Sequence, residues 1–305
     1  MIFMKKTYLI NDDSKNMRLD RWFKRYVGQI PQSLIEKSLR KGKIKVNKKK
    51  VKSSYYLIKN DLVSINNFNF SLNKINKENQ NYVASKKDLS QSSKFILENN
   101  DNFVVINKPS GIAVQSGTKS RKNILDILKK TKEFDGFYPF AVHRIDKETT
   151  GVLIVAKNRE YAQLFTSLFR IRKIHKTYLG VVLGEFENKK GTLTDYLINF
   201  EGDKKVKYKA ITHFKVIDSN IRYSLLKLDP VTGRKHQLRK QLLISGHPIY
   251  GDSKYKLIDK NKNTKSSLML HAYKINFSIK GTKYNFIAEP PKAFSNFLKE
   301  KYLKN

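Results

Sequence analysis

The stretch "HRIDKETTGVLIVAK", residues 143–157, places a short carboxylate, Asp146, between Arg144 and Lys147, just ahead of an apolar run over 151–156. An unbroken apolar run of this length predicts a strand that is buried on both faces. The polar residues before it then form the loop that enters the strand. Three roles are open to Asp146 there: partner in a surface salt bridge, turn residue, or ionised carboxylate that does chemistry.

Strands and helices are predicted on both sides of this run. The segments "FVVINKPSGIAV" and "KTYLGVVLGEF" have the composition of strands. Apolar residues at helical spacing mark residues 124–130, the segment "REYAQLFTSLFRIRK" with Asn158 as its N-cap, and "GRKHQLRKQLLISG", which ends at Gly246. Several strands follow one another without an intervening helix. The sequence therefore predicts an α+β fold with a mixed, largely antiparallel sheet and flanking helices, and argues against a doubly wound dinucleotide fold.

The N-terminal part of the chain has the features of a separate small domain over residues 17–65. Apolar residues at helical spacing in "MRLDRWFKRYV" predict one helix, and a second is predicted from Pro31 to a stop at Gly42. The alternating "KIKVN" then predicts a strand. Residues 66–95 are rich in Asn, Ser, Lys and Gln and predict a linker with one strand near its start. A larger domain is expected at 96–305.

Charge is the strongest signal in the composition. The 305 residues contain 62 Lys and Arg against 26 Asp and Glu, a formal net charge of +36. A field of this sign attracts polyanions, so nucleic acid is the leading partner and an anionic membrane surface the second. Lysine, isoleucine and asparagine are all frequent, so a compositional bias on solvated faces also explains part of the charge.

The composition also limits the chemistry. Without cysteine the chain has no disulfide, no thiolate nucleophile and no cysteine zinc site. Its six histidines form no H-x-x-x-H pair, so a histidine-rich metal site is not expected. The apolar runs are too short to cross a bilayer, and the N-terminal "MIFMKKTYLI" lacks a signal-peptide core. We therefore expect a cytoplasmic protein with no membrane partner.

A basic segment runs from Arg40 to Lys52, with eight Lys or Arg residues and no acid. One interpretation is a solvated helix end and hairpin. Because the positive charges gather where a helix passes into a strand, a grip on the phosphate backbone of RNA is favoured, with little base specificity. The predicted RNA contacts are Arg40, Lys41, Lys43, Lys45 and Lys48.

Four polar stretches lie at the edges of apolar strands or helices. They are "NKPSG" (107–111), "HRIDKETTG" (143–151), "KTYLG" (176–180) and "GRKHQLR" (233–239). Singly each is weak, since the first is an ordinary turn and a lone His236 is most often a core histidine. In this order and spacing they resemble the RluA/RluC/RluD family of RNA pseudouridine synthases. The match continues in "GHPIYGDSKY", and the N-terminal "PQSLIEKSLRKGKIKVNKKKVK" is most similar to the RluC branch, the large-subunit ribosomal RNA pseudouridine synthases.

The resemblance covers residues 17 to 298, which is nearly the whole chain. It implies a pseudouridine synthase fold preceded by a small alpha-L RNA-binding domain of the ribosomal-protein type. The chain departs from the family's pattern at Gln115, Lys240 and Gln241. These departures leave the implied reaction in place and the RNA target open.

A pseudouridine synthase breaks the bond from N1 of uridine to the ribose, turns the base and rejoins it through C5, after the uracil has left the helical stack. The resemblance gives Asp146 the role of nucleophile toward either base or sugar. Carboxylates are ionised at neutral pH and can form and release a covalent adduct. By the same resemblance, Arg239 is the cation that lies beside Asp146. Tyr178 is the aromatic residue that packs against the uracil, and it is also a candidate base for the C5 proton. Arg144 would fill the gap in the RNA, and His143 is expected to be a scaffold residue or an RNA contact.

Plainer roles stay open for several of these residues. Tyr178 is also an ordinary strand aromatic, and Arg239 also fits a solvent-facing position on a helix. Lys108 and Lys176 fit structural roles as well as phosphate contacts.

The reaction conserves every atom, so we expect no metal and no organic cofactor. The predicted function is isomerisation of specific uridines to pseudouridine in structured RNA, foremost 23S ribosomal RNA. The chain is expected to be a monomer that needs no protein partner. The alternatives are a non-catalytic RNA-binding ribosome assembly factor and a base-excising glycosylase, which would release free uracil.

Overall fold

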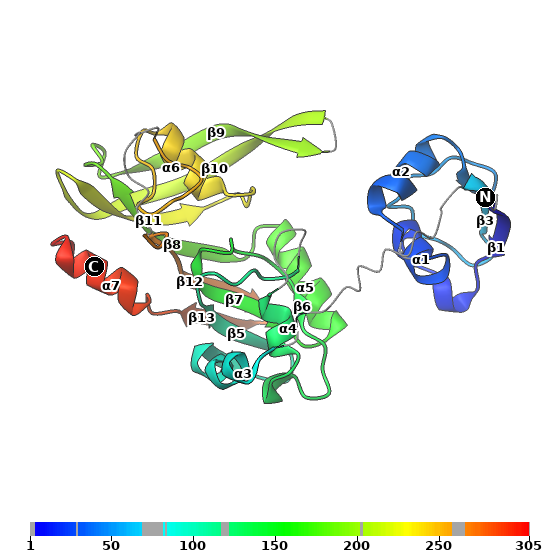
Figure 1. Cartoon of the computed structure of the whole chain (residues 1–305), viewed down its shortest axis with the longest axis horizontal. Helices are drawn as coiled ribbons and strands as arrows, with labels where there is room; N and C mark the ends of the chain where they lie inside the picture. The colour runs from blue at the N-terminus through cyan, green and yellow to red at the C-terminus, as the bar shows by residue number, and fades with distance from the viewer. Residues whose placement is uncertain are drawn as a thin grey trace. The chain divides into compact units, whose positions relative to one another are not determined.

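Two compact units make up the chain, Met1–Asn79 and Gln80–Asn305. Each has a hydrophobic core of its own. The computed structural model describes residues 4–28, 30–68, 82, 84–116, 122–201, 204–257 and 266–304 (Figure 1).

The smaller unit is a three-stranded antiparallel sheet with two helices packed on it. Leu19, Trp22 and Phe23 fall on one helical face and are buried in the same cluster as Ile35 and Val63. Both predicted helices and the strand in "KIKVN" are confirmed. The elements are β1 (Met4–Leu9), the 3-10 turn η1 (Asp12–Ser14), α1 (Leu19–Tyr26), α2 (Gln32–Arg40), β2 (Ile44–Val46) and β3 (Leu62–Phe68), in the sheet order β1-β3-β2.

Two elements differ from the predicted boundaries. Strand β1 precedes residue 17, yet it pairs antiparallel with β3 and so belongs to the smaller unit. Helix α3 (Lys86–Ser92) lies inside the predicted linker 66–95. A reciprocal cap explains this helix: the Ser85 hydroxyl accepts from the Asp88 N–H (3.2 Å), and the Asp88 carboxylate accepts from the Ser85 N–H (3.1 Å). The linker residues 69–81 lie outside the described residues.

The larger unit is built on one ten-stranded sheet. Its neighbours run in the order β4-β5-β7-β12-β8-β11-β10-β9, while β13 pairs with β12 and β6 with β7. Among the described strands every pair is antiparallel except β7 with β12, which confirms the predicted mixed, largely antiparallel sheet. The strands are β4 (Ile96–Asn99), β5 (Phe103–Lys108), β6 (Phe140–Ala141), β7 (Thr150–Ala156), β8 (His175–Leu183), β9 (Lys190–Glu201), β10 (Lys204–Asn220), β11 (Tyr223–Pro230), β12 (Leu270–Ile279) and β13 (Thr282–Ile287).

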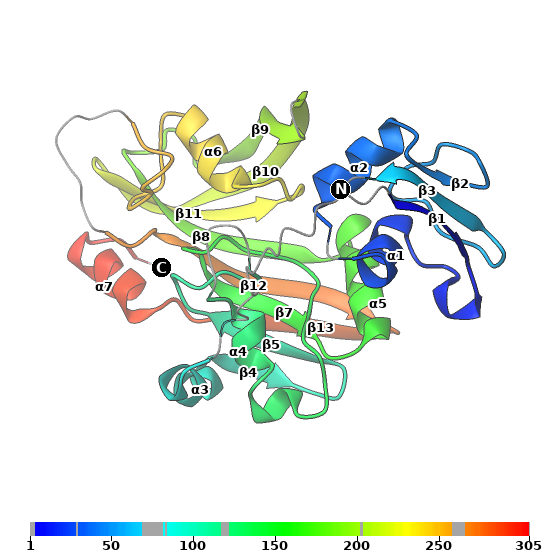
Figure 2. The same ribbon diagram turned by 45° about the vertical axis from the view of Figure 1, so that its right-hand side comes forward.

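Helices pack on this sheet through aromatic and aliphatic side chains. Phe165 is buried beside Phe103 and Phe277, with ring centroids 5.3 Å apart in both pairs. Figure 2 shows α6 alongside β9 and β10, at the opposite end of the sheet from α3. Helix α6 begins at Gln237, later than predicted, because His236 has a left-handed backbone. The remaining elements are η2 (Ser93–Phe95), α4 (Ile124–Leu128), η3 (Lys132–Phe134), α5 (Arg159–Arg170), α6 (Gln237–Ile244) and α7 (Lys292–Glu300).

Strand β7 is buried along its whole length, as its apolar run predicts. Its first residues, Thr150 and Gly151, pair in parallel with His271 and Ala272 of β12. The His271 Nε2 lies 2.8 Å from the Ala288 carbonyl and must donate to it, so its Nδ1 accepts from the Thr150 hydroxyl at 2.7 Å. These buried contacts fix the point where the polar loop before β7 meets the sheet.

Candidate active site

A hollow of about 1150 Å³ opens on the larger unit beside the loop that precedes β7. Its wall comes from that loop, the end of α5, the start of β8, the end of β11 and the start of α6. Basic side chains greatly outnumber carboxylates there, so the field inside favours an anionic ligand. The basic residues are Arg144, Arg170, Arg172, Lys176, Arg234, Lys235 and Arg239, and the acidic ones are Asp146 and Asp229.

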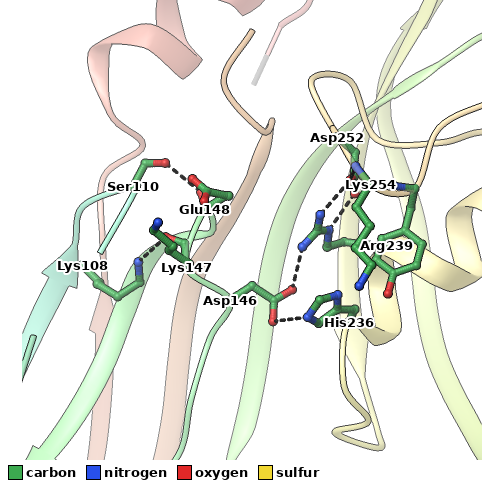
Figure 3. Close-up of polar contacts among 10 residues, drawn as sticks. Lys108, Ser110, Asp146, Lys147, Glu148, His236, Arg239, Asp252 and Lys254 are labelled. Atoms are coloured by element: carbon green, nitrogen blue, oxygen red, sulfur yellow. Dashed lines mark hydrogen bonds and ion pairs between the residues drawn. The ribbon is translucent and has the colours of Figure 1, made fainter. Parts of the chain in front are cut away.

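The "NKPSG" stretch holds the loop that carries Asp146 (Figure 3). Lys108 is fully buried, and its ammonium donates to three backbone carbonyls at 2.8, 2.9 and 3.1 Å, the last of which belongs to Lys147. The Ser110 hydroxyl donates to the Glu148 carbonyl at 3.0 Å. The backbone just after Asp146 is therefore tied to a second loop at two points.

Side chains alternate in direction through the predicted nucleophile. Ile145 is buried in the core, whereas Arg144 is exposed and the Asp146 side chain remains 23% exposed. Arg144 and Asp146 both line the hollow. Burial of Ile145 thus anchors the loop and leaves its two polar neighbours accessible.

Arg239 lies between two carboxylates from distant parts of the chain (Figure 3). Its Nε and Nη2 donate to the Asp252 carboxylate at 2.6 and 2.7 Å, and its Nη1 donates to Asp146 Oδ2 at 3.3 Å. The guanidinium also lies 5.1 Å from the centroid of the Tyr255 ring. Burial lowers the pKa of Arg239, but its hydrogen bonds and charge interactions with the two carboxylates outweigh burial and raise that pKa overall. Arg239 is therefore a permanent, buried cation.

Sequence reasoning missed Asp252, although the pair "GD" in the matched "GHPIYGDSKY" was an available signal. Its side chain is fully buried and accepts from Arg239 and from the N–H groups of Lys254 and Tyr255, both at 2.9 Å. Burial raises the pKa of Asp252, but the bonds from Arg239 and these amides lower it overall. Asp252 can orient Arg239, while its burial keeps it from meeting a substrate.

His236 also reaches Asp146. Its Nε2 lies 3.8 Å from Asp146 Oδ1, on the opposite oxygen from the one that Arg239 binds. Burial lowers the pKa of His236, the Asp146 charge raises it, and the nearby cations, Arg239 first, lower it further. The net direction is down, so the imidazole is neutral at neutral pH.

Tyr178 lies on β8 and lines the hollow, half-buried, with its ring packed against two core clusters. Burial raises the pKa of Tyr178, and the negative charge of Asp146 raises it further. The raised pKa keeps the phenol protonated at neutral pH, and a protonated phenol is a poor proton acceptor. Tyr178 can therefore present its ring face to a substrate, while its raised pKa disfavours a role as the base for the C5 proton.

His143 makes structural contacts with β7 and α5. Its Nε2 accepts from the Ile154 N–H at 2.9 Å, and its ring stacks on Phe169 with centroids 4.6 Å apart. Burial lowers the pKa of His143 to about 3, with a smaller effect in the same direction from Lys176. Of the two roles that the sequence left open, these contacts support the scaffold role, although the ring also borders the hollow.

The two lysines with open roles differ in their surroundings. Burial lowers the pKa of Lys108 to about 7, against the charges of Glu148 and Asp146, and its contacts make it a structural residue. Lys176 is half-buried on the wall of the hollow, and burial lowers the pKa of that ammonium too. Its position permits a contact with a bound anion.

Five of the basic residues predicted to bind RNA lie on the smaller unit, from the end of α2 through β2 and the turn after it. Arg40, Lys41 and Lys48 are exposed, and Lys43 and Lys45 are half-buried. A shallow hollow of about 500 Å³ next to them is lined by Glu36, Leu39, Arg40, Lys50, Val51, Lys52, Ser53 and Ser54. The five cations thus share one accessible edge of this unit.

The described part of the chain contains no group of three or more His, Asp or Glu side chains able to hold a metal ion. None of its helices combines the length and apolar character needed to span a membrane.

Comparison with known proteins relates this chain to one protein family. Residues 102–243 match the family model described as RNA pseudouridylate synthase. The chain is 32% identical over 312 residues to ribosomal large subunit pseudouridine synthase C of Buchnera aphidicola subsp. Schizaphis graminum, covering 95% of each chain. It is also 32% identical to the protein of that name from Vibrio vulnificus, covering 90% of this chain and 89% of the relative.

Solved structures give the same result. The structure of human RNA Pseudouridylate Synthase Domain Containing 4 superposes with a TM-score of 0.62 at 26% identity, covering 71% of this chain and 96% of that chain. The sequence matches extend over nearly the whole chain, and the fold match covers 71% of it. The chain therefore belongs to the RNA pseudouridylate synthase family and is an RNA pseudouridine synthase, an isomerase.

Proposed function

We propose that this enzyme isomerises specific uridines of large-subunit ribosomal RNA, with Asp146 as the nucleophile that acts on a base extruded from its stack. The observation that carries the proposal is the setting of Asp146. It lies in a strongly basic hollow, one of its oxygens is bound by Arg239, and its side chain is still partly accessible.

Asp146 is distinguished from the other carboxylates nearby by what its oxygens do. Asp252 is fully buried and accepts four hydrogen bonds. Asp229 accepts from the Thr177 hydroxyl at 2.5 Å and pairs with Lys227 at 3.6 Å. Among the described residues, Asp146 Oδ1 receives no hydrogen bond. Of these three carboxylates, Asp146 alone combines accessibility, a fixed cation and an oxygen whose lone pairs accept no hydrogen bond in the free protein, as suits a carboxylate nucleophile.

Large-subunit ribosomal RNA is the proposed substrate because the relatives that match over 90% or more of the chain carry that name. A uracil within a duplex cannot reach a carboxylate inside a hollow, so extrusion is required at a cost of a few kcal/mol. Arg144 is exposed on the same loop as Asp146 and is suited to occupy the vacated space. The Tyr178 ring supplies an apolar face on which the extruded base can pack.

The smaller unit is proposed to act as an alpha-L RNA-binding domain. Its exposed Arg40, Lys41 and Lys48 would contact backbone phosphates and raise affinity without reading bases. Reaction requires atoms of the uridine alone, so the proposed mechanism uses no metal and no cofactor.

Asp146→Asn and Asp146→Ala test the proposal. Each is expected to abolish pseudouridine formation in a transcript of large-subunit ribosomal RNA while RNA affinity changes less than about threefold, because the phosphate contacts dominate affinity. Asp101→Asn, an exposed carboxylate between β4 and β5, is the matched control and should retain full turnover. Turnover by Asp146→Ala would end the assignment of the nucleophile. Free uracil as the product would indicate a glycosylase, and binding without any product by the unmodified protein would indicate an assembly factor.

A further inference from the structure

We infer that His236 is a positioning residue for the nucleophile, fixing Oδ1 of Asp146 while Arg239 fixes Oδ2. The inference rests on the proposed role of Asp146. It is drawn from three independent features of His236: its backbone conformation, its unpartnered nitrogen and its direction toward the carboxylate (Figure 3).

The backbone of His236 is strained. Its φ of 55° and ψ of 33° lie in the left-handed region, which residues with a Cβ adopt uncommonly. The Gln237 side chain imposes this geometry, because its Oε1 accepts from the Thr232 hydroxyl (2.7 Å) and from the Arg234 N–H (3.0 Å). Its Nε2 donates to the Ile211 carbonyl at 3.1 Å. Strain that the surroundings hold in place is concentrated at functional sites.

One ring nitrogen of His236 has no structural use. Among the described side chains, its Nδ1 is buried without a hydrogen-bond partner, whereas buried polar atoms are nearly always partnered. The Tyr255 ring packs edge-on against the imidazole, with centroids 5.5 Å apart and planes at 88°, and restricts its rotation. Through this nitrogen His236 therefore adds no hydrogen bond to the stability of the described structure. The packing instead holds the ring so that Nε2 faces Asp146.

The two partners of Asp146 have different characters. Arg239 is a cation bound to Oδ2, whereas burial and neighbouring cations keep the His236 imidazole neutral. With its proton on Nε2, the imidazole is a neutral donor directed at Oδ1. In the free protein the separation of 3.8 Å is longer than a hydrogen bond, so the ring restrains Oδ1 there as a close polar neighbour. Catalytic contacts that are long in a free enzyme often tighten in its substrate complex. Two donors on two oxygens fix the plane of the carboxylate, which one donor cannot do.

Three variants separate positioning from stability. His236→Gly relieves the left-handed strain and removes the donor, so the melting temperature should stay the same or rise, while the single-turnover rate on saturating ribosomal RNA transcript falls about 10²-fold. His236→Asn tolerates the left-handed region and keeps an amide donor, and it should recover about tenfold of that loss. Tyr302→Gly is the matched control, since Tyr302 has the same φ of 55°, is 89% exposed and does not line the hollow. It should leave the rate unchanged.

A second measurement needs no RNA. In crystal structures of the free protein, the Asp146 carboxylate should occupy one rotamer in the unmodified protein and in His236→Asn, but more than one in His236→Gly. A wild-type rate in His236→Gly, or a single Asp146 rotamer in that variant, would overturn the inference. If the unmodified protein forms no pseudouridine in ribosomal RNA, the proposed substrate fails, and the rotamers of Asp146 still decide the role of His236.

Discussion

Arg239 Nη1 and Asp146 Oδ2 are 3.3 Å apart, although the two residues are separated by 93 positions in the sequence. Asp252 holds the same guanidinium through its other two nitrogens. The fully buried Asp252 carboxylate therefore orients the Arg239 guanidinium, and that guanidinium in turn orients the accessible Asp146 carboxylate. This arrangement separates a fully buried carboxylate from the accessible one that is proposed as the nucleophile.

Replacing Arg239 tests whether stability and chemistry can be separated at this cation. Arg239→Met leaves Asp252 buried without its partner and should lower the free energy of unfolding by about 3–5 kcal/mol and abolish turnover. The double variant Arg239→Met/Asp252→Leu should recover most of that stability, because a buried ion pair can be replaced by apolar groups at little net cost. It should remain inactive. Urea unfolding and single-turnover assays measure the two effects, and an active double variant would contradict the role given to Arg239.

Gly151 fixes the parallel contact between β7 and β12. A Cβ at this position would lie 2.2 Å from the Ala272 carbonyl oxygen, and the φ of +111° is itself unfavourable for other residues. Gly151→Ala should therefore cost about 4 kcal/mol or more, in the range of severe backbone and packing defects. Gly246→Ala is the matched control, because its φ of +82° is also left-handed but nothing lies within 4 Å of its added Cβ. That change should cost about 1–2 kcal/mol in urea unfolding. Equal losses would contradict the steric explanation.

Lys108 should make stability depend on pH. Its pKa falls from 10.5 to about 7 on folding, because the ammonium is buried. Between these pH values the unfolded chain binds more protons than the folded chain, so the free energy of unfolding contributed by this group rises with pH, by up to about 1.4 kcal/mol per pH unit. Lys108→Met should remove that slope. Urea unfolding of both proteins between pH 7 and 10 measures it, and Lys130→Met, which changes an exposed lysine just after α4, is the control. Parallel curves for the unmodified protein and Lys108→Met would refute the prediction.

The basic edge of the smaller unit should contribute to the salt dependence of RNA binding. The triple variant Lys41→Gln/Lys45→Gln/Lys48→Gln removes up to three phosphate contacts. The slope of log K against log salt concentration should then become shallower by about 2–3. A control variant with Lys292, Lys299 and Lys304 changed to Gln removes the same charge near the C-terminus. Filter-binding titrations at several salt concentrations give both slopes, and equal slopes for the two variants would show that the edge does not dock RNA.

Much of the fold followed from local patterns. The continuous apolar run after "HRIDKETTG" is the buried strand β7, and Asn158 caps the next helix by accepting from the Tyr161 N–H at 2.9 Å. The absence of a helix between several strands correctly indicated a largely antiparallel sheet. Helix α3 was not predicted, because its polar composition masked the short-range cap between Ser85 and Asp88.

The sequence by itself determined the residue types of the site, since a carboxylate, an arginine and an aromatic stand in recognisable stretches at the edges of apolar elements. Only the tertiary structure showed which carboxylate is accessible and which is fully buried. The sequence segments around Asp146 and Asp252 differ little in composition or local charge, and both carboxylates lie near Arg239. Their difference is in burial and in the number of hydrogen bonds that reach them. The bond from Arg239 to Asp146 spans 93 positions, whereas every hydrogen bond to Asp252 comes from within 13 positions. Burial depends on how the whole chain packs, which no local pattern records.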